Sequence, residues 1–313
     1  MTTALISHPA CLDHQTPPGH PERPDRLAAV LEALKDVEFQ KLVSIEAPPA
    51  SHPSLARVHT NGLLDFILRD AAGEARRRDF VGIDSDTVMS AGSAEAALRA
   101  AGAAIRAVDG VMTGEFANAF CAVRPPGHHA ERNRAMGFCL FNNIAVGALH
   151  ARDAHKLSRI AVVDFDVHHG NGTQDIFFAD PNLFYASTHQ SPLYPGTGFA
   201  SERGVADNIL NVPLEPGAGG EAFRVAYAHI ILPALERFAP EFIFISAGFD
   251  AHRADPLAEF ELDESDFAWA TAEICKIAAR TCGGRVVSAL EGGYDLDALA
   301  RSSAAHVRAL MEA

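Results

Sequence analysis

The stretch Ile160-Ala-Val-Val-Asp-Phe165 is a short apolar run that passes into polar residues at its end. A run of this length, rich in β-branched residues, is typical of a strand buried on both faces of a parallel sheet. Similar runs recur along the whole chain, at residues 4–7, 119–123, 183–187, 242–246 and 286–290. The sequence therefore predicts a set of short buried strands.

Segments with helical periodicity lie between several of these runs. Apolar residues recur every three or four positions over Leu27–Leu34, Ala94–Val108 and Phe223–Phe238, which indicates amphipathic helices. The alternation predicts an α/β fold with a mainly parallel central sheet and helices on both faces. We expect a single domain over residues 1–313, with a solvated loop over residues 70–86.

The composition excludes several classes of protein. Forty acidic and 26 basic residues give the chain a formal net charge of −14, which argues against direct binding to nucleic acid. The five cysteines include no Cys-x-x-Cys pair, so no disulfide framework or zinc ribbon is encoded. The first residues do not resemble a secretory signal, and no apolar run reaches membrane-spanning length. We therefore expect a cytoplasmic protein that binds no membrane.

Chemically active residues follow five of the predicted strands. In parallel α/β sheets, ligands bind beyond the carboxyl ends of the strands. The segments found there are Arg124-Pro-Pro-Gly-His-His129, Asp164-Phe-Asp-Val-His-His-Gly-Asn171, Thr188-His189, Ala247-Gly-Phe-Asp250 and Glu291-Gly-Gly-Tyr294.

Asp164, Asp166 and His168 are spaced by two, which on an extended chain would place their side chains on one side. They would form half of a metal site, and a neighbouring strand end would supply the next ligand. Asp250 follows its strand most closely and is the preferred candidate, with Asp255 as the rival. A set of two carboxylates and one imidazole suits zinc with open positions for water and a substrate carbonyl. The alternative is a hydrogen-bonded polar cluster at the edge of the sheet.

His128 and His129 follow two prolines, which make their loop rigid. Beside a metal, one of the two can take a proton from water and later donate it to a leaving amine. Asp164 and Asn171 are available to hold the two imidazole tautomers. Tyr294 could donate its hydroxyl to a developing oxyanion, although Gly-Gly-Tyr alone also fits a tyrosine with only a packing role.

Together these motifs resemble those of the zinc-dependent histone deacetylase superfamily, most closely its class II branch and the bacterial histone deacetylase-like amidohydrolases. The resemblance runs from His20-Pro-Glu-Arg-Pro-Asp-Arg26 to Tyr294 in the family's order. It implies an arginase-like α/β fold with one Zn²⁺, and it favours Asp250 over Asp255. The implied zinc ligands are Asp166, His168 and Asp250. The implied ligands of a structural K⁺ or Na⁺ are Asp164, Asp166, His168, Ser187 and Thr188.

The resemblance also implies roles for individual residues. His129 resembles the general base and acid, and His128 the second histidine, held by Asp164. Tyr294 resembles the tyrosine that polarises the substrate carbonyl. Asn171 stands where class I enzymes have Asp, which leaves His129 without a carboxylate partner and predicts a lower basicity.

The resemblance further implies a narrow acyl-lysine tunnel. Its walls match Gly137, Phe138 and Tyr194, and many members have Phe at the last of these positions. Leu257 matches a gatekeeper position that is Glu in the polyamine-selective eukaryotic member, which favours acyl-lysine, since a cationic amine would prefer a carboxylate there.

We therefore predict a zinc-dependent amidohydrolase that removes acetyl or short acyl groups from the ε-amine of lysine in proteins or peptides. One alternative is hydrolysis of acetylated polyamines or other small acetylated amines, which the acidic surface would attract. Another is a two-manganese ureohydrolase, for which a second carboxylate cluster is lacking. A third is a metal-bound binding protein without activity. The sequence leaves the oligomeric state open.

Overall fold

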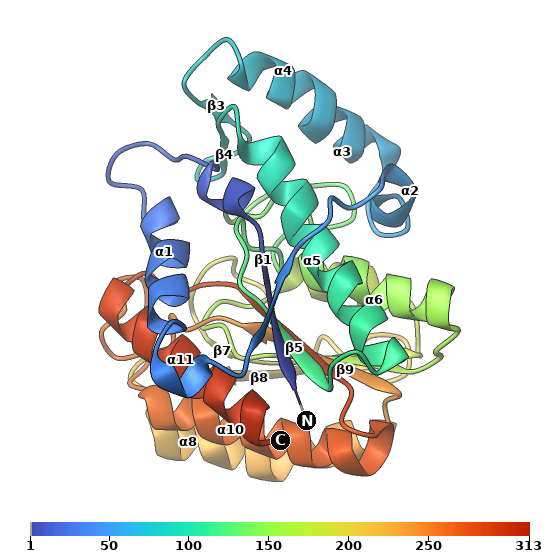
Figure 1. Cartoon of the computed structure of the whole chain (residues 1–313). Helices are drawn as coiled ribbons and strands as arrows, with labels where there is room; N and C mark the ends of the chain where they lie inside the picture. The colour runs from blue at the N-terminus through green and yellow to red at the C-terminus, as the bar shows by residue number, and fades with distance from the viewer. Residues whose placement is uncertain (1) are drawn as a thin grey trace.

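The computed structural model describes residues 2–313 and has at its centre an eight-stranded sheet of order β2-β1-β5-β10-β9-β6-β7-β8 (Figure 1). Every pair of neighbouring strands in it is parallel. This confirms the predicted α/β class and sheet. The strands are β1 (Thr3–Ser7), β2 (Val43–Glu46), β5 (Asn118–Cys121), β6 (Ile160–Asp164), β7 (Leu183–Gln190), β8 (Ile209–Leu214), β9 (Phe242–Ala247) and β10 (Val286–Leu290).

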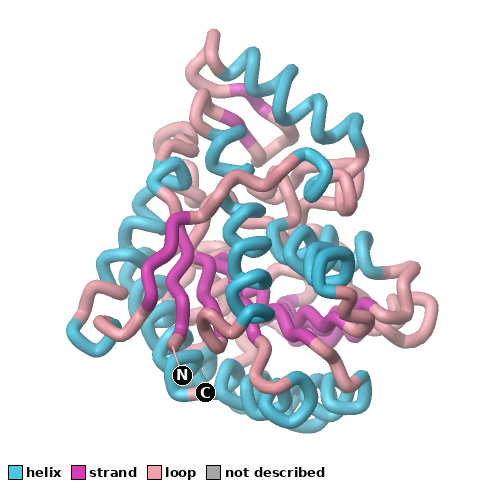
Figure 2. Tube along the Cα trace, turned by 45° about the vertical axis from the view of Figure 1, so that its right-hand side comes forward, coloured by secondary structure: helices cyan, strands magenta, loops and turns pink. Residues whose placement is uncertain are grey.

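Long helices cover the sheet on both faces, and Figure 2 shows the strands enclosed between them. On one face, α5 (Ser93–Thr113) and α6 (Asn143–His155) pack against each other and on the central strands. The other face is covered by α1 (Pro24–Ala33), α8 (Gly220–Ala226), α9 (Leu232–Phe238), α10 (Glu264–Cys282) and α11 (Leu296–Glu312). Within residues 2–313, no helix is long and apolar enough to cross a membrane.

Shorter elements lie mainly outside these layers. At the top of Figure 1, α2 (His52–Leu55), α3 (Asn61–Asp65), η3 (Phe66–Ala71) and α4 (Ala72–Ala75) lead to β3 (Val81–Gly82) and β4 (Val88–Met89). The remaining short elements are η1 (Pro9–Leu12), η2 (Val37–Phe39), α7 (Asn171–Phe177) and η4 (Tyr227–Ile231). The expectation of a loop over residues 70–86 is therefore wrong in part. Ala71, Ala72 and Ala75 are buried, and this small apolar face keeps the segment helical.

Several elements lacked a clear periodic signal in the sequence. The edge strands β2 and β8 carry polar residues, and β8 even contains Pro213, which only an edge position tolerates. The helix α6 buries mainly small residues, so its apolar stripe is weak. By contrast, α10 has strong end signals, because Asp263 and Asp266 form a capping box and Gly283 ends the helix in the left-handed conformation.

The strand order decides where the polar segments meet. β5, β10, β9 and β6 are consecutive at the centre of the sheet, although β5 and β6 precede β9 and β10 in the chain. Because all are parallel, the loops that follow them emerge at the same edge. Four of the five polar segments singled out in the sequence are therefore brought together.

Candidate active site

Asp166, His168 and Asp250 form a buried cluster beyond the ends of β6 and β9. Their ligand atoms all lie within 4.8 Å of one another. His168 Nδ1 lies 3.1 Å from Asp166 Oδ1 and 3.0 Å from Asp250 Oδ2. The backbone N–H of Gly292 donates to Asp166 Oδ2 and that of Val167 to Asp250 Oδ1, at 2.8 and 2.9 Å. Backbone groups therefore orient both carboxylates toward the histidine.

This cluster concentrates negative charge away from water. Burial and the neighbouring Asp166 raise the pKa of Asp250 to about 6. Burial opposes the protonation of His168, but the two carboxylates raise the pKa of its imidazole to about 10. Two adjacent buried carboxylates are costly unless a cation balances them. The two oxygens and one nitrogen suit a divalent transition ion.

Asp164 lies outside this cluster, contrary to the expectation from the spacing of two. β6 ends at Asp164, so Asp166 and His168 lie beyond the regular extended strand. The N–H of Asp166 donates to Asp164 Oδ1, and the N–H of His168 donates to Asp166 Oδ1. Such bonds to the side chain two residues earlier are typical of turns. They turn the chain after β6, and the clustered ligand atoms belong to Asp166, His168 and Asp250 without Asp164.

Asp164 instead holds His128. Its Oδ2 atom lies 3.0 Å from His128 Nδ1 and also accepts a hydrogen bond from the Tyr185 hydroxyl. Burial alone would lower the pKa of His128, but Asp166 and Asp164 raise it to about 10. The two carboxylates therefore favour the protonated form of this imidazole.

His129 has a neutral partner instead. Its Nδ1 atom lies 2.8 Å from Asn171 Oδ1, and the Asn171 amide nitrogen donates to Glu131 Oε1 at 2.8 Å. The amide oxygen therefore faces the imidazole, which assigns the proton to Nδ1 and leaves Nε2 as the free base. Burial and the nearby His128 and His168 hold the pKa of His129 well below its usual range.

Tyr294, in the segment after β10, lines the same cavity as His129 and His168. The Arg26 guanidinium lies 4.7 Å from the centre of its ring and donates to the carbonyl oxygens of Gly293 and Glu291. Asp255 Oδ2 accepts the N–H of Tyr294 at 2.7 Å. Burial raises the pKa of the Tyr294 hydroxyl well above its usual value, so it is a neutral donor over the physiological range.

Asp255, the rival metal ligand, is absent from the buried cluster, which contains Asp250. Besides holding Tyr294, its other oxygen accepts the N–H of Leu257 at 3.0 Å. Burial and Asp250 raise the pKa of Asp255 to about 7. The structure thus gives this carboxyl a positioning role that the sequence did not suggest.

A cavity of about 210 Å³ joins these groups to the surface. Gly137 has a φ of +56°, and a Cβ there would collide with the His129 ring, so only glycine lets this wall close on the imidazole. The Tyr194 ring stands perpendicular to the His129 ring, 5.1 Å between centroids, and is 37% exposed at the mouth. The lining residues are Asp86, His129, Gly137, Phe138, His168, Leu193, Tyr194, Leu257 and Tyr294.

Two buried acidic residues support the site without facing the cavity. Glu291 Oε2 accepts the N–H groups of Gly127 and His128, at 2.6 and 3.1 Å. Glu22 forms a buried ion pair with Arg124. Both acids belong to motifs quoted from the sequence, and Glu22 also pairs with nearby Arg26, but Gly127, His128 and Arg124 lie more than one hundred residues from the acids they contact. No local pattern could have revealed these bonds.

The residues expected to hold a monovalent cation also lie close together. Asp164 and Ser187 are direct neighbours in the pairing of β6 with β7, and Thr188 follows. The Ser187 hydroxyl lies 2.9 Å from His189 Nδ1. The Thr188 hydroxyl is buried and has no hydrogen-bond partner within residues 2–313.

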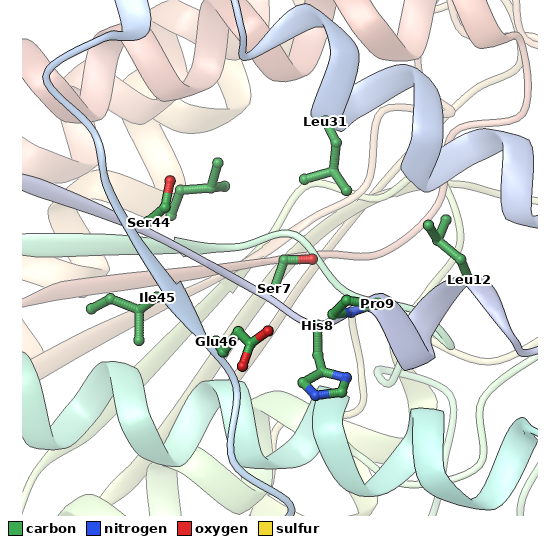
Figure 3. Close-up of a pocket in the computed structure, with 9 residues that line it drawn as sticks. Ser7, His8, Pro9, Leu12, Leu31, Ser44, Ile45 and Glu46 are labelled. Atoms are coloured by element: carbon green, nitrogen blue, oxygen red, sulfur yellow. The ribbon is translucent and has the colours of Figure 1, made fainter.

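A separate hollow of about 350 Å³ lies at the β1–β2 edge of the sheet (Figure 3). Its titratable groups are His8 and Glu46, and His8 Nδ1 accepts the N–H of Ala10 within its own turn. The other lining residues are Leu5, Ser7, Pro9, Leu12, Leu31, Ser44 and Ile45. This hollow gathers no set of groups suited to catalysis, unlike the smaller cavity at His129.

Several known proteins are similar to this chain over most of its length. The family model of the histone deacetylase domain matches residues 20–310. The histone deacetylase-like amidohydrolase of Pseudomonas aeruginosa is 42% identical over 285 residues, 88% of this chain and 73% of that protein. A probable deacetylase of Archaeoglobus fulgidus is 39% identical over 303 residues, 95% of this chain and 82% of that protein.

The fold has a close structural counterpart as well. A crystal structure of the HDA15 HD domain matches with a TM-score of 0.93 at 36% identity, covering 99% of this chain and 88% of that one. The expected deacetylase-like α/β fold is thereby confirmed. With the family model matched over nearly the whole chain, the chain belongs to the histone deacetylase family.

Proposed function

We propose that this protein is a zinc-dependent deacetylase that hydrolyses acetyl or other short acyl amides on the ε-amine of lysine in proteins or peptides. One arrangement carries the proposal. His168 of the buried Asp166–His168–Asp250 cluster, the free base of His129 and the hydroxyl-bearing Tyr294 ring line the same narrow cavity. A nucleophile, a proton acceptor and an oxyanion donor are the components that amide hydrolysis requires.

The metal part of the proposal rests on the donor set. Asp166, His168 and Asp250 supply two carboxylates and one imidazole, all buried and oriented, and a catalytic zinc site needs three protein ligands with a position left open. Zinc bound there would polarise the amide carbonyl and lower the pKa of a water molecule.

The other residues move the proton and stabilise charge. His129 accepts a proton from the attacking water at Nε2 and returns it to the departing amine. His128, held at Nδ1 by Asp164, lies beside His129 and can stabilise negative charge in the cavity when it is protonated. The Tyr294 hydroxyl donates a hydrogen bond to the oxygen of the former carbonyl.

The choice of substrate rests on the cavity wall. Phe138, Leu193 and Leu257 present apolar surface, which suits the four methylene groups of a lysine side chain. A second candidate, an N-acetylated polyamine, is favoured by one observation: Asp86 places a carboxylate in the lining. The net charge of −14 would also attract such a cation.

Side-by-side kinetics on acetyl-lysine peptides and N-acetylspermidine test the proposal. We expect kcat/KM for the peptides to be higher by about tenfold or more, because the wall at Leu257, unlike the part of the lining that holds Asp86, offers a secondary ammonium group no partner. The reverse preference would assign the protein to polyamine hydrolysis. If the enzyme hydrolysed neither substrate, the proposed deacetylase activity would be refuted.

We also propose that Asp164, Ser187 and Thr188 help to hold a structural K⁺ or Na⁺. Their adjacency across β6 and β7 and the unpartnered Thr188 hydroxyl support this assignment. Oxygen donors suit such hard cations.

Replacing Asn171 by Asp is expected to move the acid limb of the pH profile upward. His129 must be neutral to act as a base, so activity falls as the pH drops through the pKa of His129. A carboxylate at 171 favours the imidazolium and raises that pKa by on the order of one unit or more. The measurement is kcat/KM against pH, with metal content as the control for an intact site. If the acid limb of the pH profile did not move, His129 would not be the catalytic base.

A further inference from the structure

A second group of side chains of the types that bind metal ions lies outside the candidate active site. Asp109 belongs to α5, and His150 and His155 belong to α6. The Nε2 atoms of His150 and His155 lie 2.7 and 2.8 Å from the same oxygen of Asp109. The ligand atoms of all three residues lie within 4.8 Å of one another.

The convergence of the two histidines depends on the tertiary structure. Residues five apart on an α-helix point about 140° away from each other, so this spacing alone brings no pair together. Here His155 is the last residue of α6. One carboxylate oxygen of Asp109, on the neighbouring helix, lies within hydrogen-bond distance of both imidazole rings. The ring centroids of His150 and His155 are 5.8 Å apart.

The group is open to solvent and separate from the deacetylase cavity. The Asp109 side chain is 44% exposed, and those of His150 and His155 are 13% and 21% exposed. α6 begins at Asn143, whose side chain donates to Pro125 beside the catalytic histidines. At 1.5 Å per residue, His150 and His155 lie about 10 and 18 Å further along the helix.

We propose that Asp109, His150 and His155 bind a Zn²⁺ ion that links α5 to α6. Two imidazoles and one carboxylate are a donor set suited to zinc, and solvent completes the coordination. Bonds of about 2.1 Å at tetrahedral angles place ligand atoms about 3.4 Å apart, so the distance from each imidazole nitrogen to the Asp109 oxygen must increase by less than an ångström. Within residues 2–313, no Arg or Lys forms an ion pair with Asp109, whose ion-pair partners are these two histidines.

The competing interpretation is a hydrogen-bonded triad that joins the two helices without metal. The variant Asp109→Asn distinguishes the zinc site from the metal-free triad. The amide oxygen of Asn can still accept from both rings, whereas the loss of the negative charge weakens a zinc site. His155→Gln removes a ligand directly. His229→Gln is the matched control, because His229 is an exposed histidine outside the group.

The experiment measures Zn²⁺ bound per chain by equilibrium dialysis of the zinc-loaded enzyme, followed by elemental analysis. The wild type and His229→Gln are expected to bind one ion more than the catalytic centre holds. Asp109→Asn and His155→Gln are expected to bind that ion at least about tenfold more weakly. Deacetylase activity should be the same in all four proteins.

A second readout uses Cu²⁺, which prefers the same donors. Its electron paramagnetic resonance spectrum should show two imidazole nitrogens in the wild type and one in His155→Gln. The proposal is overturned if the wild type binds no additional zinc, or if Asp109→Asn and His155→Gln keep wild-type affinity. Lower thermal stability of Asp109→Asn or His155→Gln without a change in zinc binding would establish the metal-free triad instead.

Discussion

Asp250→Asn is expected to lose its zinc and to lower kcat/KM by about 10³-fold or more. The amide keeps the size of the carboxylate, and its oxygen can still accept the Val167 N–H, so the local fold should persist. What is lost is the negative charge that a zinc ligand supplies. Without the ion, the attacking water keeps a pKa far above neutral pH. Metal content and activity, measured on the same preparation, check this result.

Asp255→Asn is the matched control for that variant. Asp255 is also a buried acid in the segment after β9, but its oxygens accept the N–H groups of Leu257 and Tyr294. We expect Asp255→Asn to retain zinc while activity falls through the displaced Tyr294. Chelation of the wild type should abolish turnover, and added zinc should restore it. If Asp250→Asn kept its metal and Asp255→Asn lost it, the ligand assignment would be wrong.

Tyr294→Phe is expected to lower kcat by about 10² to 10³-fold, the usual effect of removing one oxyanion donor. The ring packs between Arg26 and Phe138, and Phe preserves those contacts. KM and zinc content should therefore stay near wild type, because the hydroxyl acts in the transition state. Steady-state kinetics on an acetyl-lysine peptide make the measurement.

Tyr194→Phe makes the same chemical change at the mouth of the cavity. Tyr194 is partly exposed and packs its ring on His129, so loss of its hydroxyl should change kcat less than about threefold. Full activity in Tyr294→Phe, or an equal loss in both variants, would contradict the oxyanion role of Tyr294.

The sequence revealed much of the fold because the central strands are buried on both faces. Apolar runs such as 242–245 can be recognised in the sequence alone, since most side chains of a strand buried on both faces are apolar. Edge strands face water and tolerate residues such as Pro213, so β2 and β8 have no comparable apolar run. Helices that bury small residues, such as α6, were missed for a similar reason.

The candidate site was predictable where chemistry and local motif coincide. His128, His129 and Tyr294 stand in Gly- and Pro-rich segments directly after strands, and the structure brings all three together. The expected one-sided row of Asp164, Asp166 and His168 was wrong, because hydrogen bonds to the Asp164 and Asp166 side chains turn the chain after β6.

The sequence by itself determined the class of fold, the segments that carry the candidate site and the residue types of a candidate metal site. The tertiary structure decided which carboxylates share a site: Asp250 lies with His168, Asp164 with His128, and Asp255 with the backbone of Tyr294. It alone brought Asp109 beside His150 and His155. The physical reason is that side-chain chemistry is a local property of the sequence, whereas these partners meet through strand order and helix packing between distant segments.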